Sequence, residues 1–463
     1  MDRIDRELPP LLRRLHTDEW SAAARDGRDQ RLALQVRDAV RDLAVDQGLP
    51  TLLASATRRG TAVGLRALNA EWGAEFYAVP EDAARSDAAA DDAFHSVGPV
   101  VDVQTHFLAP HSAEAMGRDF LYDMYRALMP DWWSEMDDIG TWTFAEYLRN
   151  LFVESETAVA VLTSGPGLLA TRNLFNDELA AARLLCDGAG APGRILNHAV
   201  VHADERDEVE RMEEWRDTFR PVGWKVYTIR RVGPDGTIPG WMLDDEEHGL
   251  PFLERARALD VKLVCAHKGI SRIADNGSPR DVGPAARAYP DIDFVIYHSG
   301  YELPTDGAPP EGAYDPDRPE GVDRLIASLD AAGVGRGANV YAELGSTWFS
   351  LVRRPVEAAH VLGKLIQRVG ADNVIWGTDS IWFGSPQPLI DAFRTFQIPE
   401  AMCDEFGYEQ LTDEVRRKIL CGNAARVYGL DLDAVAALKA EHDRTWAREL
   451  ADRYEHGRLG AFR

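Results

Sequence analysis

Eight short runs of β-prone residues, each separated from the next by a longer segment, constrain the fold of this 463-residue chain more than any other feature. The runs span residues 99–106, 157–163, 194–202, 223–228, 261–267, 293–298, 339–344 and 373–379. Apolar residues recur at helical spacing between them, as at 174–185, 205–219, 249–259, 322–332 and 356–369. Apolar strands that alternate with helices are typical of a parallel sheet, and eight such units can close a barrel. We therefore predict an α/β protein built on a (β/α)8 TIM barrel.

The residues before the first run carry a different pattern. Residues 31–45 place Leu32, Val36 and Val40 on one helical stripe, whereas residues 80–92 are small and polar, as in a surface linker. No catalytic pattern occurs in this part of the sequence. We predict a helical N-terminal extension and linker over residues 1–95, and a barrel with C-terminal helices over residues 96–463.

The composition limits the partners of the protein. The 76 acidic residues exceed the 51 basic residues, and the net charge of −25 disfavours nucleic acid and anionic membranes. No apolar run is long enough for a membrane span, and the first residues lack the apolar stretch of a signal peptide, so we expect a cytoplasmic protein. The four cysteines form no C-x-x-C pair. A metal would therefore be held by His, a carboxylate or a modified Lys.

Chemically capable side chains stand at or near the ends of six of the eight runs. They are His106, Lys225, His267, His298, Glu343 and Asp379. The carboxyl ends of the strands form the active-site rim of a (β/α)8 barrel, and Gln104 shares a strand face with His106. Taken singly, a strand-end His is usually hydrogen-bonded within the fold, and a strand-end Asp often caps a helix. Together, three imidazoles and a carboxylate indicate a divalent metal, with Zn²⁺ as the first choice and Mn²⁺ or Fe²⁺ as alternatives.

Several motifs resemble those of the amidohydrolase superfamily. They are DVQTH at 102–106, GWKVY at 223–227, AHKG at 266–269, YHSG at 297–300, WGTDS at 376–380 and KILCGNAARVYGL at 418–430. The resemblance covers about residues 99–430, in the branch that includes aminocarboxymuconate-semialdehyde and γ-resorcylate decarboxylases. It implies that His106, His267 and Asp379 bind metal, and that His298 is a further ligand or an acid/base. Gln104 departs from the His or Glu of the family, and its neutral amide is a weaker ligand.

Lys225 supports two interpretations. The chain has only six lysines, so a Lys within an apolar strand is notable. In binuclear members of the superfamily, the lysine of strand four is carboxylated and bridges two metals, and Lys225 matches that position. It is equally compatible with an unmodified cation beside the substrate, able to bind a carboxylate.

Side chains that follow the strands are candidates for substrate binding. The aromatic residues Tyr301, Trp348 and Trp382 would suit a cyclic or aromatic molecule, although loop packing would also explain them. Lys268 is a candidate for an anionic substrate group, and Glu343 for a substrate cation or a histidine.

These observations predict a metal-dependent hydrolase of a small cyclic or aromatic amide, ester or lactone. Asp379, His298 and Lys225 would be its catalytic residues, with metal-activated water as the nucleophile. The first alternative is a metal-dependent decarboxylase, C–C lyase or hydratase of an aromatic or unsaturated acid. The second is a barrel that has lost its metal and serves only in binding. We expect a homodimer, because symmetric dimers are the commonest oligomers.

Overall fold

The structure is a computed structural model in which part of the chain is described. The described residues are 7–13, 27–111, 142–165, 172–229, 240–270, 275–302, 310–317, 319–440 and 444–455. Within these ranges, no helix has both the length and the apolar content that a bilayer span requires.

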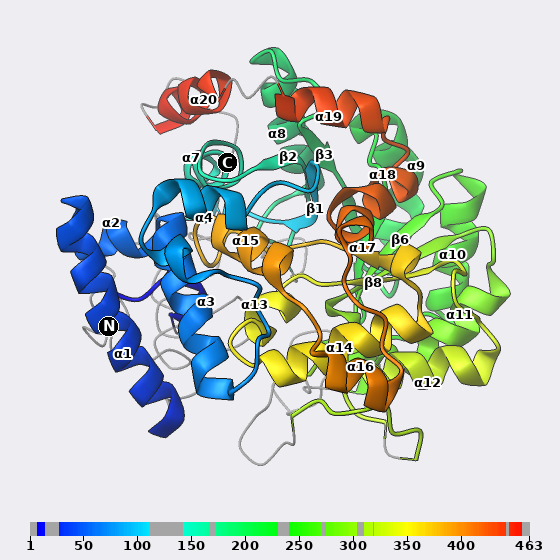
Figure 1. Ribbon diagram of the computed structural model, residues 1–463. Helices are drawn as coiled ribbons and strands as arrows, with labels where there is room; N and C mark the ends of the chain where they lie inside the picture. Colours follow the sequence, from blue (N-terminus) through cyan, green and yellow to red (C-terminus); the bar gives the residue numbers. More distant parts are fainter. Residues whose placement is uncertain are drawn as a thin grey trace.

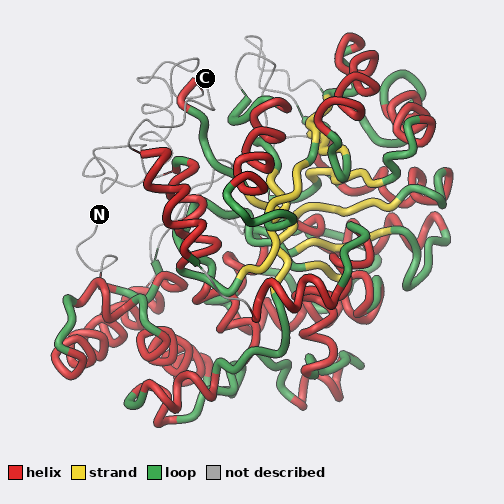
Figure 2. Tube along the Cα trace, turned by 90° about the horizontal axis from the view of Figure 1, so that it is seen from above, coloured by secondary structure: helices red, strands yellow, loops and turns green. Residues whose placement is uncertain are grey.

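The strands described in the structure form two parallel sheets, and their order in space is their order in the chain. The strands lie at the centre, with helices outside them (Figure 2). The first sheet holds β1 (Val100–Thr105), β2 (Thr157–Leu162) and β3 (Ile195–Asn197). The second holds β4 (Ala199–Val201), β5 (Trp224–Tyr227), β6 (Leu263–His267), β7 (Asp293–Tyr297), β8 (Val340–Glu343) and β9 (Val374–Ile375). The fully buried patterns of β1, β2 and β6 agree with strands that are covered on both faces.

Hydrogen bonds join the ends of the two sheets. The predicted run 194–202 appears as β3 and β4, which meet at His198, where the backbone N–H of His198 donates to Leu162 of β2. Beyond β9, the N–H of Asp379 donates to the carbonyl of Gln104 at 2.9 Å, so the chain returns to β1. The α/β class and the alternation of strands and helices predicted for a (β/α)8 fold are confirmed.

Helices follow the strands along the chain and lie around them (Figure 1). In α12, Val322, Leu325, Ile326 and Leu329 are buried at helical spacing, and the helix ends at Gly333, whose φ of 68° suits a left-handed cap. The helices are α7 (Phe144–Leu148), α8 (Asn176–Gly188), α9 (Arg206–Phe219), α10 (Gly249–Ala258), α11 (Val282–Ala288), α12 (Val322–Ala332), α13 (Thr347–Leu351), α14 (Pro355–Arg368), α15 (Gln387–Thr395), α16 (Glu400–Phe406), α17 (Asp413–Arg417), α18 (Asn423–Val427), α19 (Leu432–Ala440) and α20 (Thr445–Glu455).

The N-terminal extension is helical, as predicted, but its last part is not a bare linker. It contains α1 (Gly27–Gln47), α2 (Thr51–Ser55), α3 (Arg58–Trp72) and α4 (Asp87–Ala93), and a 3-10 turn lies at Glu81–Ala84. Residues 80–92 therefore include two helical segments. Their small side chains are buried at Ala83 and Ala90, and the hydroxyl of Ser86 caps α4, so small and polar residues serve packing here.

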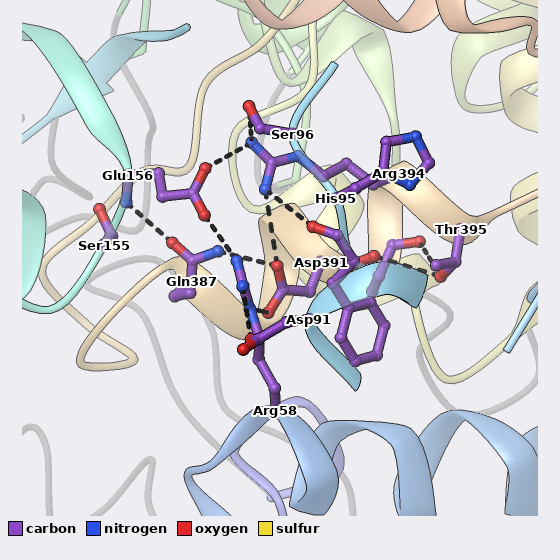
Figure 3. Close-up of polar contacts among 12 residues, drawn as sticks. Arg58, Asp91, His95, Ser96, Ser155, Glu156, Gln387, Asp391, Arg394 and Thr395 are labelled. Carbon is purple, nitrogen blue, oxygen red and sulfur yellow. Dashed lines mark hydrogen bonds and ion pairs between the residues drawn. The ribbon is translucent and has the colours of Figure 1, made fainter. Parts of the chain in front are cut away.

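The extension and the barrel share one hydrophobic core. Tyr77 pairs with Phe396 in an antiparallel bridge, and the Tyr77 hydroxyl donates to the carbonyl of Val352 at the end of α13. Figure 3 shows a polar cluster that includes Thr395, the residue before Phe396. In this cluster Arg58 of α3 reaches Glu156 at 2.5 Å and Arg394 of α15 reaches Glu156 at 2.8 Å. The extension is thus packed against α13 and α15, the helices that follow β8 and β9.

Candidate functional site

Unusual backbone conformations gather where β6 to β9 end. Seven non-glycine residues of the described chain have positive φ, and five of them follow these strands. The five are Ile270, His298, Ser299, Ser346 and Asp379. Left-handed conformations cost free energy in residues with a Cβ, and such strain concentrates at functional sites. The strand ends are therefore the place to look for chemistry.

The carboxylate of Asp379 lies at the centre of this region. Its Oδ1 is 2.9 Å from His106 Nε2 and accepts from Gln104 Nε2 at 2.8 Å, and its Oδ2 accepts from the Ser346 hydroxyl at 2.5 Å. Burial alone would raise the pKa of Asp379, but the contacts with His106, His298 and Ser346 outweigh burial and lower that pKa. At neutral pH the side chain is an anion that can hold a metal or accept a proton.

His298 and His267 form a second pair. Nε2 of His298 is 3.2 Å from Nδ1 of His267, and Nδ1 of His298 donates to the carbonyl of Gly345 at 2.7 Å. Burial lowers the pKa of His298 to about 4 and holds the pKa of His267 well below its usual value. Both rings are neutral at pH 7. Because His298 uses its Nδ1–H on a carbonyl, its Nε2 carries a lone pair that suits a metal ligand or a base.

Gln104 lies between the Asp379 carboxylate and the His298 ring. Its Nε2 lies 3.4 Å from Nε2 of His298 as well as beside Asp379. Its Oε1 is buried and accepts no hydrogen bond from the described residues. A buried amide oxygen without a donor indicates a place for a cation or for a donor group of a ligand.

Lys225 is buried in β5 between two aromatic rings. Its Nζ lies 3.5 Å from the centre of the Tyr297 ring and 4.6 Å from that of Tyr227. Tyr227 also stacks on His267, with ring centres 4.9 Å apart. Contact with ring faces stabilises the charged form of an amine.

Glu343 holds backbone groups of the neighbouring turns. It accepts from the N–H of His298 at 3.0 Å and from the N–H of Gly345 at 2.5 Å. Burial raises the pKa of Glu343 well above its usual range. A Cβ on Gly377 would lie 1.8 Å from Glu343 Oε1, so a larger residue would displace this side chain. Its role in substrate binding stays a prediction. Its contacts in the structure hold the backbone of the turns that contain His298 and Gly345.

The other candidates for substrate binding differ in their surroundings. Trp382 lies next to the residues around Asp379, with its ring centre 6.2 Å from that of His106. Its buried Nε1 has no acceptor among the described residues. Lys268 instead forms a fully buried ion pair with Asp281 at 2.6 Å. The hydroxyl of Tyr301 contacts Arg354 and Glu357, and Trp348 donates to the carbonyl of Leu389. For these three residues, substrate binding remains a prediction that these contacts do not favour.

The donor set matches the chemistry of a divalent metal. Imidazole, carboxylate and amide oxygen are accepted ligands, and neighbouring donors in a tetrahedral zinc site lie about 3.3 Å apart, close to the separations within the two pairs. However, no group of three or more His, Cys, Asp or Glu side chains in the described ranges is arranged to hold a metal. The residues therefore fit a metal in their chemistry and pairwise spacing, while their side chains are hydrogen-bonded to one another.

Sequence reasoning missed Ser346 and Tyr227, and also the carbonyl of Thr163, which lies 3.1 Å from Nδ1 of His106. Each lies within a few residues of the carboxyl end of a strand. The strand-end rule that selected His298 would have reached Ser346, had it been extended from titratable residues to hydroxyl groups.

The chain was compared with solved structures, with curated proteins and with the sequence patterns of protein families. The solved structures that resemble it include 5-carboxyvanillate decarboxylase from Sphingomonas paucimobilis, with 14% identity, TM-score 0.42, and coverage of 72% of this chain and 99% of that one. A dihydroxybenzoic acid decarboxylase from Polaromonas sp. JS666 with bound manganese shows 15% identity, TM-score 0.39 and coverage of 72% and 97%. A proposed 2-pyrone-4,6-dicarboxylic acid hydrolase from Pseudomonas putida shows 17% identity and a TM-score of 0.40, with coverage of 72% of this chain and 97% of that one.

No curated protein matches the chain. The sequence pattern of the amidohydrolase family (Amidohydro_2) matches residues 101–430, which include the described strands apart from the first residue of β1 and all the site residues described above. The chain therefore belongs to the amidohydrolase family.

Proposed function

We propose that the protein is a metal-dependent hydrolase that acts on an amide, ester or lactone of a small cyclic or aromatic molecule. The observation that carries this proposal is the state of Asp379. Its pKa is lowered although it is buried, and three donors surround it, so it is a base at neutral pH rather than an acid. A buried base beside metal-capable imidazoles is what the activation of water requires.

The metal would be held by His106, Asp379 and one or both of His267 and His298, with Gln104 Oε1 as a weaker oxygen donor. Zn²⁺ is our first choice, and Mn²⁺ and Fe²⁺ are the alternatives. When bound, the metal would supply Lewis acidity to water and to the carbonyl group of the substrate.

The side chains around the metal would transfer protons and bind the substrate. Asp379 would take the proton from the attacking water and return it to the leaving group. His298, with its lone pair on Nε2, would act as ligand or base, which are among the roles that the family resemblance implies for it. Trp382, beside His106, would pack against the ring of the substrate.

Decarboxylation of an aromatic or unsaturated acid is the second candidate, and Lys225 favours it. A buried lysine between two tyrosine rings places positive charge in the interior, where a carboxylate group could bind. The difficulty is the proton that must be added to the substrate carbon, because Asp379 is ionised and His298 is neutral near pH 7.

The test combines metal analysis with product analysis. Purified protein, expressed with added zinc and manganese, is analysed for bound metal and then assayed on aromatic lactones, esters and amides and on hydroxylated aromatic acids. We expect bound transition metal and hydrolysis that D379N abolishes. Release of CO2 without hydrolysis would transfer support to the second candidate. Absence of bound metal in protein from metal-supplemented cells would contradict both enzymatic candidates.

A further inference from the structure

The two oxygens of the Asp379 carboxylate have separate partners. Oδ1 faces His106 and Gln104, whereas Oδ2 accepts a hydrogen bond from the Ser346 hydroxyl at 2.5 Å. Ser346 and Asp379 are both buried. A short hydrogen bond to an ionised oxygen is among the stronger interactions in proteins, so Ser346 can control how the carboxylate is turned.

The backbone places this hydroxyl at some cost. Ser346 has φ 51° and ψ −29°, and Asp379 has φ 62°, so both residues are left-handed. The N–H of Ser346 donates to the carbonyl of Thr378 at 3.2 Å, which joins the turn after β8 to the turn after β9. A strained conformation persists only where its surroundings enforce it, and this one brings a hydroxyl to a buried carboxylate.

The same turn also holds His298. The carbonyl of Gly345 accepts from His298 Nδ1, and the hydroxyl of Thr347 donates to the carbonyl of His298 at 3.1 Å. A Cβ on Gly345 would lie 2.2 Å from Gln104 Oε1, so the backbone of the turn passes close to the site. The turn thus contacts three of the side chains that the proposed function uses.

We infer that Ser346 is a positioning residue, which fixes the orientation of the Asp379 carboxylate so that Oδ1 faces His106 and Gln104. The inference rests on the proposed function insofar as Asp379 serves there as metal ligand and base. The orientation itself is a property of the chain without metal, so it can be tested separately.

Two substitutions separate orientation from stability. S346G removes the hydroxyl and relieves the strain of a positive φ, whereas S346T keeps a hydroxyl but is strained, because a β-branched residue fits this conformation poorly. S350A is the matched control. Ser350 is a buried serine on α13, the helix that begins directly after Ser346, and its hydroxyl has no partner among the described residues.

The experiment uses the full chain. Crystal structures of the metal-free variants give the orientation of Asp379, binding of Mn²⁺ alone gives the affinity, and thermal unfolding gives Tm. In S346G, we expect the carboxylate to turn or to occupy two orientations, and Mn²⁺ affinity to fall about 10- to 100-fold. In S346T, we expect the original orientation and an affinity within about threefold of the wild type, despite a lower Tm. S350A should match the wild type in all three.

Other outcomes would overturn the inference. An unchanged carboxylate in S346G, or a carboxylate that also turns in S346T, shows that the hydroxyl does not position Asp379. If Mn²⁺ affinity and Tm fall together in both S346G and S346T, the role of Ser346 is purely structural. If the wild type binds no Mn²⁺ or Zn²⁺, the proposed function fails, and the metal-free crystal structures alone decide the role of Ser346.

Discussion

His106 Nε2 and Asp379 Oδ1 lie 2.9 Å apart, so the ends of the first and the last predicted strands meet in one polar contact. The contact is continued by backbone hydrogen bonds, since His106 N–H donates to Ser380 and Asp379 N–H donates to Gln104. The site therefore depends on the strand arrangement as a whole, and a substitution at Asp379 tests both its charge and this junction.

Replacement of Asp379 by Asn should remove function with little change in fold. Asn has the same shape but no negative charge, so it is a poor metal ligand and no base. We expect a loss of about 10²- to 10⁴-fold in kcat and a large loss of Mn²⁺ affinity, with an unchanged circular dichroism spectrum. D391N, at an equally buried carboxylate in the cluster of Figure 3, is the control and should keep the wild-type affinity. Metal binding by D379N as tight as that of the wild type would refute the assigned role.

Lys225 should remain an unmodified amine. Its Nζ lies over the rings of Tyr227 and Tyr297, and contact with ring faces favours the ammonium form, against the opposite effect of burial, whereas only a neutral amine can be carboxylated. After incubation with isotopically labelled bicarbonate and Zn²⁺, we expect no carbamate resonance in the NMR spectrum and no rise in bound metal. K225M is the control for background signal. A carbamate resonance in the wild type that is lost in K225M would instead support the bridging lysine.

The positions of the site residues could be predicted because they depend on strand order and strand ends alone. Parallel strands deliver their last residues to one edge of a sheet, so Gln104, His106, His267, His298 and Asp379 were identifiable from the chain. No separate packing information was needed for them.

The substrate-binding candidates depend on contacts between distant segments, which a strand pattern does not specify. Lys268 also follows a strand, yet Asp281 from a later segment takes its ammonium group. Trp348 lies on α13, but its ring packs on Phe393 of α15 and on Phe396, the residue that pairs with Tyr77 of the extension. Ser346 was missed because the strand-end rule was applied to titratable side chains, and its contact with Asp379 depends in addition on a φ of 51°, which the strand pattern does not specify.

The stability of the protein should depend on the neutral form of His198. Nε2 of His198 lies 3.3 Å from the Tyr428 hydroxyl in the interior, and burial, with the charge of Lys225, lowers the pKa of His198 to about 3. Between pH 6.5 and 3 the unfolded chain binds a proton at this residue and the native chain does not, so acidification destabilises the fold. The contribution is complete above pH 6.5 and decreases by about 1.4 kcal/mol per pH unit below it.

Urea unfolding of the wild type and H198Q, measured from pH 7 to pH 5, checks this dependence. The free energy of unfolding should fall less steeply with acidification in H198Q than in the wild type. H95Q, at an exposed histidine, is the control and should keep the wild-type slope. Equal slopes in the wild type and H198Q would show that His198 gains its proton as readily in the native state as in the unfolded chain.

The ion cluster of Figure 3 should stabilise the contact between the extension and the barrel. Arg58 of α3 reaches Glu156 at 2.5 Å and Asp391 of α15 at 3.5 Å, so R58A leaves these two carboxylates with Arg394 as their remaining cation among the described residues. We expect R58A to lower the free energy of unfolding by about 1–3 kcal/mol, since hydrogen bonds to charged groups are worth that much. R85A removes an exposed pair with Glu81 and should cost under about 1 kcal/mol. Equal losses in the two variants, measured by urea unfolding, would mean that the extension does not depend on this cluster for its attachment.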